Sequence, residues 1–147
     1  MEIKDFLSTS EVVVDFPASD KADLLRGLAT RAASTLKLPG DVVVRSIQMR
    51  DELGSTGIGN GVSIPHARLH ELKKPFGLLV RLKQPIAYQA IDDQPVDIVF
   101  MLLLPAASQS DQLNVLAVVA RKLRDQAVLR RARSATTATA LYQALAG

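Results

Sequence analysis

The chain of 147 residues is 48% hydrophobic and only 4% aromatic, which predicts a single domain over residues 1–147 with an aliphatic core. It contains no cysteine, which excludes disulfides, thiol catalysis and thiolate metal ligands. The formal net charge of +3 does not indicate nucleic-acid binding, because no aromatic residues alternate with the basic cluster at 121–133 to stack bases. We interpret this cluster as a solvated helix face or as a docking surface for an acidic partner protein.

The N-terminal sequence, MEIKDFLSTSEVVVDF, has neither the basic segment nor the apolar segment of an export signal. The longest uninterrupted apolar run extends only from Ile98 to Leu104, far less than a bilayer span requires. We therefore expect a cytoplasmic protein without membrane insertion.

In the first half of the chain, the apolar spacing changes from strand-like to helical and then gives way to a glycine-rich loop. Pro17 ends the first strand, and Ser19 is the expected N-cap of the first helix. Arg50 shares a stripe with apolar residues of the second helix. The expected elements are a strand over 11–16, a helix over 20–37, a helix over 41–53 and a short strand near 61–65.

The second half predicts two strands followed by helices. The segment 77–86 alternates as a strand with one wet face would, whereas 96–105 is apolar throughout, as in a central strand covered on both faces. Expected N-caps are Ser108, Asp125 and Ser134, for a helix to about 124 and two more that end near Leu145. Strands interleaved with helices predict a three-layer α/β/α sandwich, in the α/β class.

The stretch GSTGIGNGVSIPHARLH, residues 54–70, holds half of the chain's 8 glycines. It is not a P-loop, because Asn60 stands where a lysine is needed, and it is not a dinucleotide-binding motif, because Val62 and Ile64 replace the third glycine in the two possible registers. Pro65 replaces the second glycine of a serine-hydrolase elbow. The sequence therefore argues against these nucleotide and hydrolase sites.

The two histidines of the chain, His66 and His70, are four residues apart in this stretch. The intervening residues lack the glutamate of a zinc-protease helix, and Pro65 argues against a helix that would place both rings on one face. We expect no metal site and no cofactor.

His66 remains as a single histidine presented by a glycine-rich loop. It is either a histidine without a special role or a nucleophile, since imidazole is often neutral at cellular pH. Glycines allow backbone N–H groups to converge on an anion, and the hydroxyls of Ser55 and Thr56 are further donors. A nucleophile beside an anion site is typical of phosphoryl transfer.

Three segments resemble one family. RDELGSTGIGNGVSIPHARL (50–69) resembles the active-site segment of the enzyme IIA proteins of the bacterial phosphoenolpyruvate-dependent phosphotransferase system, of the fructose/mannitol type and above all its nitrogen-regulatory branch. PIAYQAIDDQPVDIVFMLLLPA (85–106) and LNVLAVVARKLRD (113–125) resemble two further blocks of the same family. The resemblance covers nearly the whole chain.

The resemblance implies a mixed β-sheet flanked by helices and a histidine that a histidine phosphocarrier protein phosphorylates. It places that phosphohistidine at His66 and a guanidinium near the ring at Arg50. From the residues alone, Arg50 could equally satisfy the C-terminus of its helix.

The sequence departs from the family pattern at two positions. Ala67 replaces a common glycine, and Gln112 stands where many relatives have a second active-site histidine. We predict that Gln112 faces His66 from the start of a helix, where its amide can donate a hydrogen bond to a phosphoryl oxygen but cannot carry positive charge.

These features predict a cytoplasmic phosphotransferase component. We expect no attached transport or carrier domain, which favours a mainly regulatory role. The resemblance suggests kinases and potassium-transport systems as targets bound according to phosphorylation state. Two alternatives stay open: a sugar-specific IIA that passes phosphate to a IIB domain, and an interaction module that has lost phosphorylation.

Overall fold

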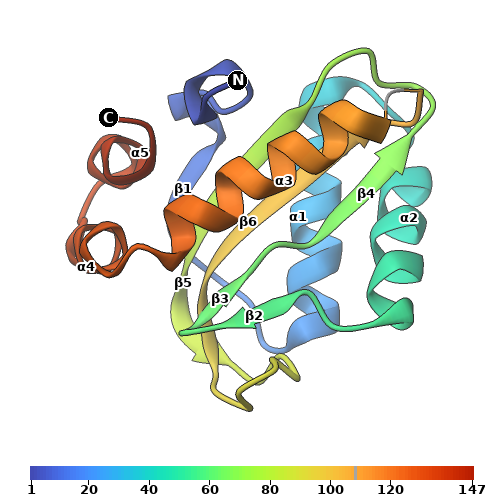
Figure 1. The fold of residues 1–147 in the computed structure, drawn as a ribbon. Helices are drawn as coiled ribbons and strands as arrows, with labels where there is room; N and C mark the ends of the chain where they lie inside the picture. Colours follow the sequence, from blue (N-terminus) through green and yellow to red (C-terminus); the bar gives the residue numbers. More distant parts are fainter. Residues whose placement is uncertain (108) are drawn as a thin grey trace.

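The computed structural model describes residues 1–107 and 109–147, and it describes the side chains outside 108–112. The described residues form a six-stranded sheet in the order β1-β5-β6-β3-β2, and β4 also pairs with β6 (Figure 1). The strands are β1 (Val12–Phe16), β2 (Gly57–Gly59), β3 (Val62–Ser63), β4 (His66–Leu69), β5 (Phe76–Ile86) and β6 (Val96–Pro105). β5 runs antiparallel to β6, whereas β1 runs parallel to β5, and both β3 and β4 run parallel to β6. The predicted mixed sheet is confirmed.

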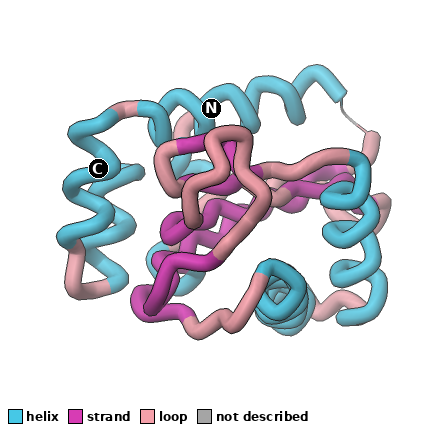
Figure 2. Tube along the Cα trace, turned by 90° about the horizontal axis from the view of Figure 1, so that it is seen from below, coloured by secondary structure: helices cyan, strands magenta, loops and turns pink. Residues whose placement is uncertain are grey.

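Helices cover both faces of the sheet, so that the strands lie between two helical layers (Figure 2). One face carries α1 (Lys21–Leu36) and α2 (Gly40–Leu53), and the other carries α3 (Gln109–Arg124), α4 (Gln126–Ser134) and α5 (Ala138–Ala146). Two short 3-10 turns, Ile3–Asp5 and Thr9–Glu11, precede β1. The predicted three-layer α/β/α sandwich is confirmed.

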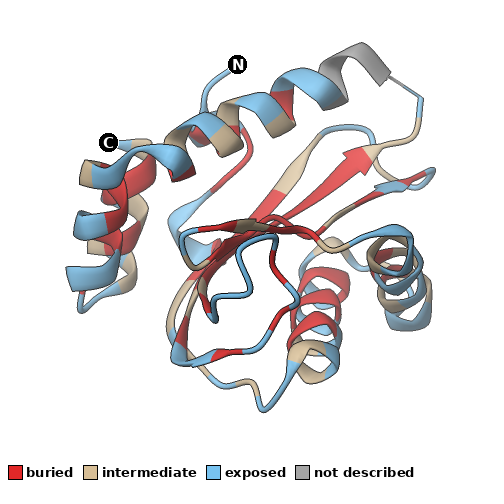
Figure 3. Cartoon of the chain, turned by 60° about the horizontal axis from the view of Figure 1, so that its bottom comes forward, coloured by how far each residue is buried: buried red, intermediate tan, exposed pale blue. Residues whose placement is uncertain are grey.

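The apolar strand β6 connects the two cores. Its side chains alternate between faces: Phe100 and Leu102 pack with α3, α4 and α5, whereas Val99 and Met101 pack with α1 and α2. The buried residues are concentrated along the sheet and on the helix faces turned toward it (Figure 3). Among the described residues, no helix has both the length and the apolar content that a membrane span requires.

Three sequence expectations about element ends and faces need correction. Asp20, not Ser19, caps α1, because its carboxylate accepts from the Asp23 N–H. Ser134 is the last residue of α4, and Thr137 caps α5 instead. The predicted wet face of β5 is limited to residues 83–85, because α4 and α5 cover the preceding part of the strand. The cap expected at Ser108 lies outside the described residues.

The half-buried Arg81 of β5 belongs to this covered part. Its guanidinium donates to the carbonyls of Ala132, Arg133 and Ala135 at the end of α4. A charged side chain within β5 is therefore satisfied by helix-terminal carbonyls rather than by water.

Candidate active site

The glycine-rich stretch is a β-hairpin rather than an open loop. β2 and β3 pair antiparallel, and Asn60 and Gly61 connect them with φ of 56° and 78°, the conformation of a tight hairpin turn. The Asn60 N–H donates to the carboxylate of Asp92 at 3.0 Å. A carboxylate of the same chain therefore occupies one of the backbone amides in the stretch that was expected to bind an anion.

The hairpin tip and His66 are also well separated along the sheet. Val62, next to the tip, pairs with Ile98 of β6, whereas His66 pairs with Leu102. Four residues of strand correspond to about 13 Å. The tip amides and His66 therefore do not form one site.

The hydroxyls of Ser55 and Thr56 are both turned toward Tyr88. Ser55 Oγ donates to the Tyr88 carbonyl at 3.1 Å, and Thr56 Oγ1 lies 2.9 Å from the Tyr88 hydroxyl. Gly57 is required here, because a Cβ at this position would lie 2.8 Å from the Cα of Ala90. The structure thus gives both predicted phosphate-binding hydroxyls a partner away from His66, and neither residue lines the groove described below.

His66 begins β4, and each nitrogen of its half-buried ring has a protein partner. Nδ1 lies 2.8 Å from the carbonyl oxygen of Ile64, which can only accept, so Nδ1 carries the proton. Nε2 lies 3.3 Å from Nε of Arg50, which can only donate. The ring is therefore the Nδ1–H tautomer, with the Nε2 lone pair directed toward Arg50.

The surroundings of His66 favour the neutral ring. Burial lowers the pKa of His66 below its ordinary value of 6.5, and the positive charge of Arg50 lowers it further. The hydrogen bond to the Ile64 carbonyl opposes this change but does not reverse it. At neutral pH Nε2 consequently carries a lone pair rather than a proton, which is the form that nucleophilic attack requires.

Arg50 lies in the last turn of α2 and makes two contacts. Its Nη1 donates to the Gly54 carbonyl at 2.9 Å, just beyond the helix, while Nε faces His66. Both interpretations of Arg50 that the sequence left open therefore hold in part. Among the described side chains, no carboxylate lies at ion-pair distance from Arg50; the neighbouring Asp51 pairs with Lys21 at 2.8 Å.

His66 and Arg50 open into a groove of about 730 Å³ between α2, β4 and α3. Three of its side chains are large, apolar and exposed: Met49 at 59%, Leu53 at 86% and Leu113 at 70%. The remaining lining residues are Ser46, Glu52, Ala67, Arg68, Leu104 and Leu116. An exposed apolar rim around a reactive nitrogen is typical of a site that meets another protein.

The arrangement of His66, Arg50 and the groove coincides with a family match. The family model described as phosphoenolpyruvate-dependent sugar phosphotransferase system, EIIA 2, matches residues 5–147. The chain belongs to this family. It is thus a component of a phosphotransferase system, and the fructose/mannitol-type resemblance is confirmed.

Relatives of this EIIA domain point to the nitrogen-regulatory branch. A nitrogen regulatory protein of Bradyrhizobium diazoefficiens is 38% identical over 146 residues, which cover 99% of this chain and 95% of the relative. A nitrogen regulatory protein of Escherichia coli K12 is 44% identical over 84% of this chain and 76% of its own length. The crystal structure of nitrogen regulatory protein IIA-Ntr from Neisseria meningitidis superposes with a TM-score of 0.92 at 29% identity, covering 97% and 98% of the two chains.

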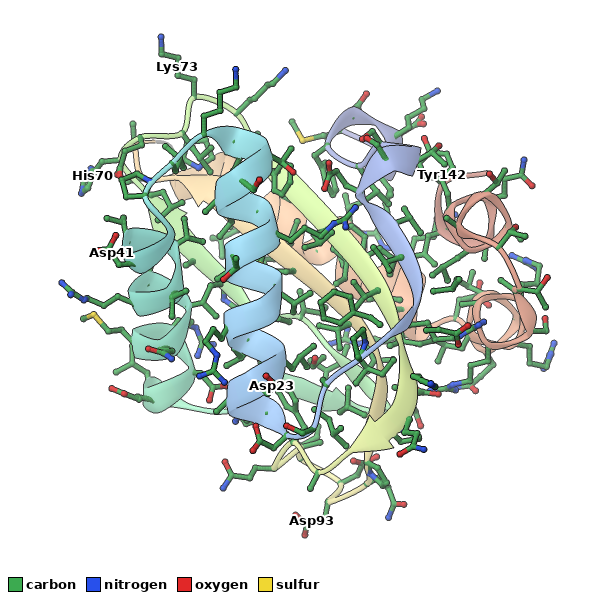
Figure 4. All side chains as sticks on the ribbon, turned by 180° about the vertical axis from the view of Figure 1, so that it is seen from behind. Asp23, Asp41, His70, Lys73, Asp93 and Tyr142 are labelled. Carbon is green, nitrogen blue, oxygen red and sulfur yellow. The ribbon has the colours of Figure 1, made fainter. Side chains whose placement is uncertain are left out.

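His70 does not line the described site, and the position of the Gln112 side chain stays untested. His70 is exposed in the turn after β4, and Figure 4 shows it at the edge of the molecule. The side chain of Gln112 lies outside the described residues, although its neighbour Leu113 lines the groove. In the described part of the chain no group of three His, Cys, Asp or Glu side chains could hold a metal ion.

Sequence reasoning missed Tyr88 of the EIIA domain, which connects the segment before β2 to α1. Its ring lies 4.7 Å below the ammonium of Lys21, and its hydroxyl and carbonyl hold Thr56 and Ser55. A signal was available, because Tyr88 is one of only 2 tyrosines in an aromatic-poor chain. A buried tyrosine usually has a polar partner, but the sequence did not indicate which residue that partner is.

Proposed function

We propose that the chain is the phosphoacceptor of a nitrogen-type phosphotransferase system, with Nε2 of His66 as the atom that receives the phosphoryl group. The observation that carries the proposal is the state of this ring: Nδ1 is held by the Ile64 carbonyl at 2.8 Å, and Nε2 faces Arg50 across 3.3 Å. The donor would be the phosphohistidine of a histidine phosphocarrier protein, in keeping with the family.

In the proposed step, the Nε2 lone pair attacks phosphorus in line with the donor's phosphorus–nitrogen bond. The new bond forms as the old one breaks, and the electron pair of the old bond returns to the donor ring. The proton on Nδ1 stays in its hydrogen bond with Ile64, so no base is needed to remove a proton from the attacking nitrogen. Phosphoryl transfer of this kind depends mainly on positioning and on charge stabilisation.

Arg50 supplies that charge in the proposal. Its Nε donates to the Nε2 lone pair in the free protein, so this hydrogen bond opens as phosphorus bonds to Nε2, and the guanidinium then lies beside the phosphoryl group. Because Arg50 has no carboxylate partner in the described chain, an incoming anion meets a positive charge that is not already neutralised.

Ser55, Thr56 and Gln112 were predicted as further phosphate ligands. The contacts with Tyr88 favour a positioning role for Ser55 and Thr56, and the role of Gln112 stays a prediction.

The groove supports a protein rather than a small molecule as the partner. Its rim carries Met49, Leu53 and Leu113, which a carrier protein would cover on docking. We further propose that phosphorylation changes the charge of this surface and so controls binding to regulatory target proteins, as the nitrogen-regulatory relatives suggest. Kinases and potassium-transport systems are the target classes that follow from the resemblance.

A direct test is to incubate the protein with phosphoenolpyruvate, enzyme I and the phosphocarrier and to measure its intact mass. The proposal predicts a gain of one phosphate that is lost in acid, and no gain when the carrier is omitted. Absence of the gain would favour the interaction-module alternative. Onward transfer from His66 to a separate IIB domain would favour the sugar-specific alternative.

A further inference from the structure

The peptide unit of Ile64 is held on both of its polar atoms. Its carbonyl accepts from Nδ1 of His66 at 2.8 Å, and its N–H donates to the carbonyl of Thr56 at 3.0 Å. Ile64 itself is buried in the core between the sheet and α3. The orientation of the His66 ring therefore depends on where the backbone of Thr56 holds the Ile64 peptide.

Thr56 is in turn fixed by a buried side-chain contact. Its hydroxyl lies 2.9 Å from the hydroxyl of Tyr88, with Thr56 exposed to 5% and Tyr88 to 1%. Tyr88 is anchored from two other directions: its carbonyl accepts from Ser55 Oγ at 3.1 Å, and the ammonium of Lys21 lies over its ring. Because the surroundings are dry, a hydroxyl pair here is a stronger constraint than the same pair would be in water.

We propose that Thr56 and Tyr88 are positioning residues for the phosphoacceptor: their hydroxyl contact holds the Ile64 carbonyl against Nδ1 of His66 and so keeps Nε2 unprotonated and aimed at the groove. The contact forms a continuous chain from Tyr88 through Thr56 and Ile64 to His66. The role in transfer rests on the proposed function, whereas the effect on the ring does not.

The tautomer matters because only one form of the ring is a nucleophile at Nε2. A neutral imidazole free in water carries its proton mainly on Nε2, and in that form the lone pair is on Nδ1. The bond to Ile64 opposes this preference. Loosening a neutral hydrogen bond corresponds to roughly a two- to tenfold change in the ratio of the two forms.

The test uses the full chain labelled with ¹⁵N at histidine, in which the ring nitrogen shifts report tautomer and protonation. In Thr56→Val and Tyr88→Phe we expect the Nε2–H share of His66 to rise about two- to tenfold and its pKa to fall further, because the Ile64 bond favours the charged ring. Thr56→Ser keeps the hydroxyl and is expected to behave as wild type.

Tyr142→Phe is the matched control, because Tyr142 lies on α5, on the opposite side of the molecule from α2 (Figure 4). The double variant Thr56→Val/Tyr88→Phe removes both hydroxyls of the contact, so neither is left without the other, which separates positioning from loss of folding. If this double variant is folded and its His66 shifts and pKa match those of wild type, the proposal is wrong. If the shifts change as expected but wild type never accepts phosphate, positioning holds and the proposed function fails.

Discussion

Two arginines lie in the last turns of helices on opposite faces of the sheet, and their partners differ. Arg133, in the last turn of α4, binds the carboxylate of Asp97 at 3.0 Å and also donates to the Asn60 carbonyl at the hairpin tip. Arg50, in the last turn of α2, contacts the neutral ring of His66 beyond the base of the hairpin, and no carboxylate lies at ion-pair distance from it in the described residues. The first charge is paired with a carboxylate, and among the described side chains the second is not.

We propose that this difference separates a structural contact from a functional one. A paired arginine with several acceptors holds two elements together and has little charge left for a ligand. An arginine that faces an uncharged imidazole keeps its positive charge for an anion and lowers the pKa of that imidazole at the same time. The unpaired charge, rather than the glycines, marks the candidate site.

The largest expected effect is at the ring itself. His66→Ala removes the accepting nitrogen and should abolish phosphorylation by the carrier, whereas His70→Ala removes an exposed ring outside the groove and should leave it nearly intact. Intact-mass measurement after incubation with the carrier gives both results. Equal labelling of the two variants would place the phosphoryl group elsewhere.

Arg50→Ala tests the unpaired charge. Loss of a charged hydrogen bond in a partly dry site costs about 1.5–3 kcal/mol, which corresponds to roughly a ten- to a hundredfold slower transfer or shorter phosphohistidine lifetime. Arg50→Lys should recover only part of this, because an ammonium lacks the planar fork. Arg133→Ala is the counterpart and should leave the transfer rate unchanged, as measured by rapid quench. A similar loss of rate in both arginine variants would remove the distinction between the two regions.

At the hairpin tip the expected effect is on stability instead. A Cβ at Gly61 would lie 2.5 Å from Nη2 of Arg133, and the residue has φ of 78°, so Gly61→Ala should destabilise the fold by roughly 1–3 kcal/mol. Gly54→Ala is the matched control, because nothing lies within 4 Å of its added Cβ. Urea unfolding measures both, and equal midpoints would show that the tip tolerates a side chain.

A smaller effect is expected in the pH dependence of phosphoryl transfer to His66. Because the pKa of His66 is lowered from 6.5, the ring stays neutral below that pH, and acceptance of the phosphoryl group should persist under acid conditions in which an ordinary histidine is mostly protonated.

The same lowered pKa affects folding stability. Stability should fall as pH drops through 6.5 toward the lower folded-state pKa, because the unfolded chain binds the proton first. Arg50→Ala should raise the pKa of His66. NMR titration gives these values, and a wild-type pKa at or above 6.5 would contradict the account.

Gln112 carries the smallest expected change. We predict that Gln112→His speeds acceptance a fewfold, mainly below about pH 6.5 where the new ring is charged. Gln112→Leu should slow it more than Gln112→Ala, because leucine also excludes a compensating water. Single-turnover rates between about pH 6 and 8 decide this. Identical rates in all three variants would mean that Gln112 does not contribute.

Much of the fold followed from the sequence, whereas the polar contacts of the site did not. The apolar run at 96–105 and the helical spacing before Leu53 depend on local patterns, and those elements are confirmed. The glycine-rich stretch was expected to be an anion-binding loop, but tertiary pairing with β6 makes it a hairpin whose tip binds Asp92. The contact between Thr56 and Tyr88 joins residues far apart in the chain, so no local pattern could indicate it.

The central claim is that Nε2 of His66 is the phosphoacceptor, and the nitrogen can be identified directly. The chain, labelled with ¹⁵N at histidine and phosphorylated by the carrier, is examined by ³¹P–¹⁵N correlation NMR. The account predicts one phosphorus coupled to Nε2 of His66, with Nδ1 still protonated and bound to the Ile64 carbonyl. Coupling to Nδ1, or to either nitrogen of His70, would contradict it.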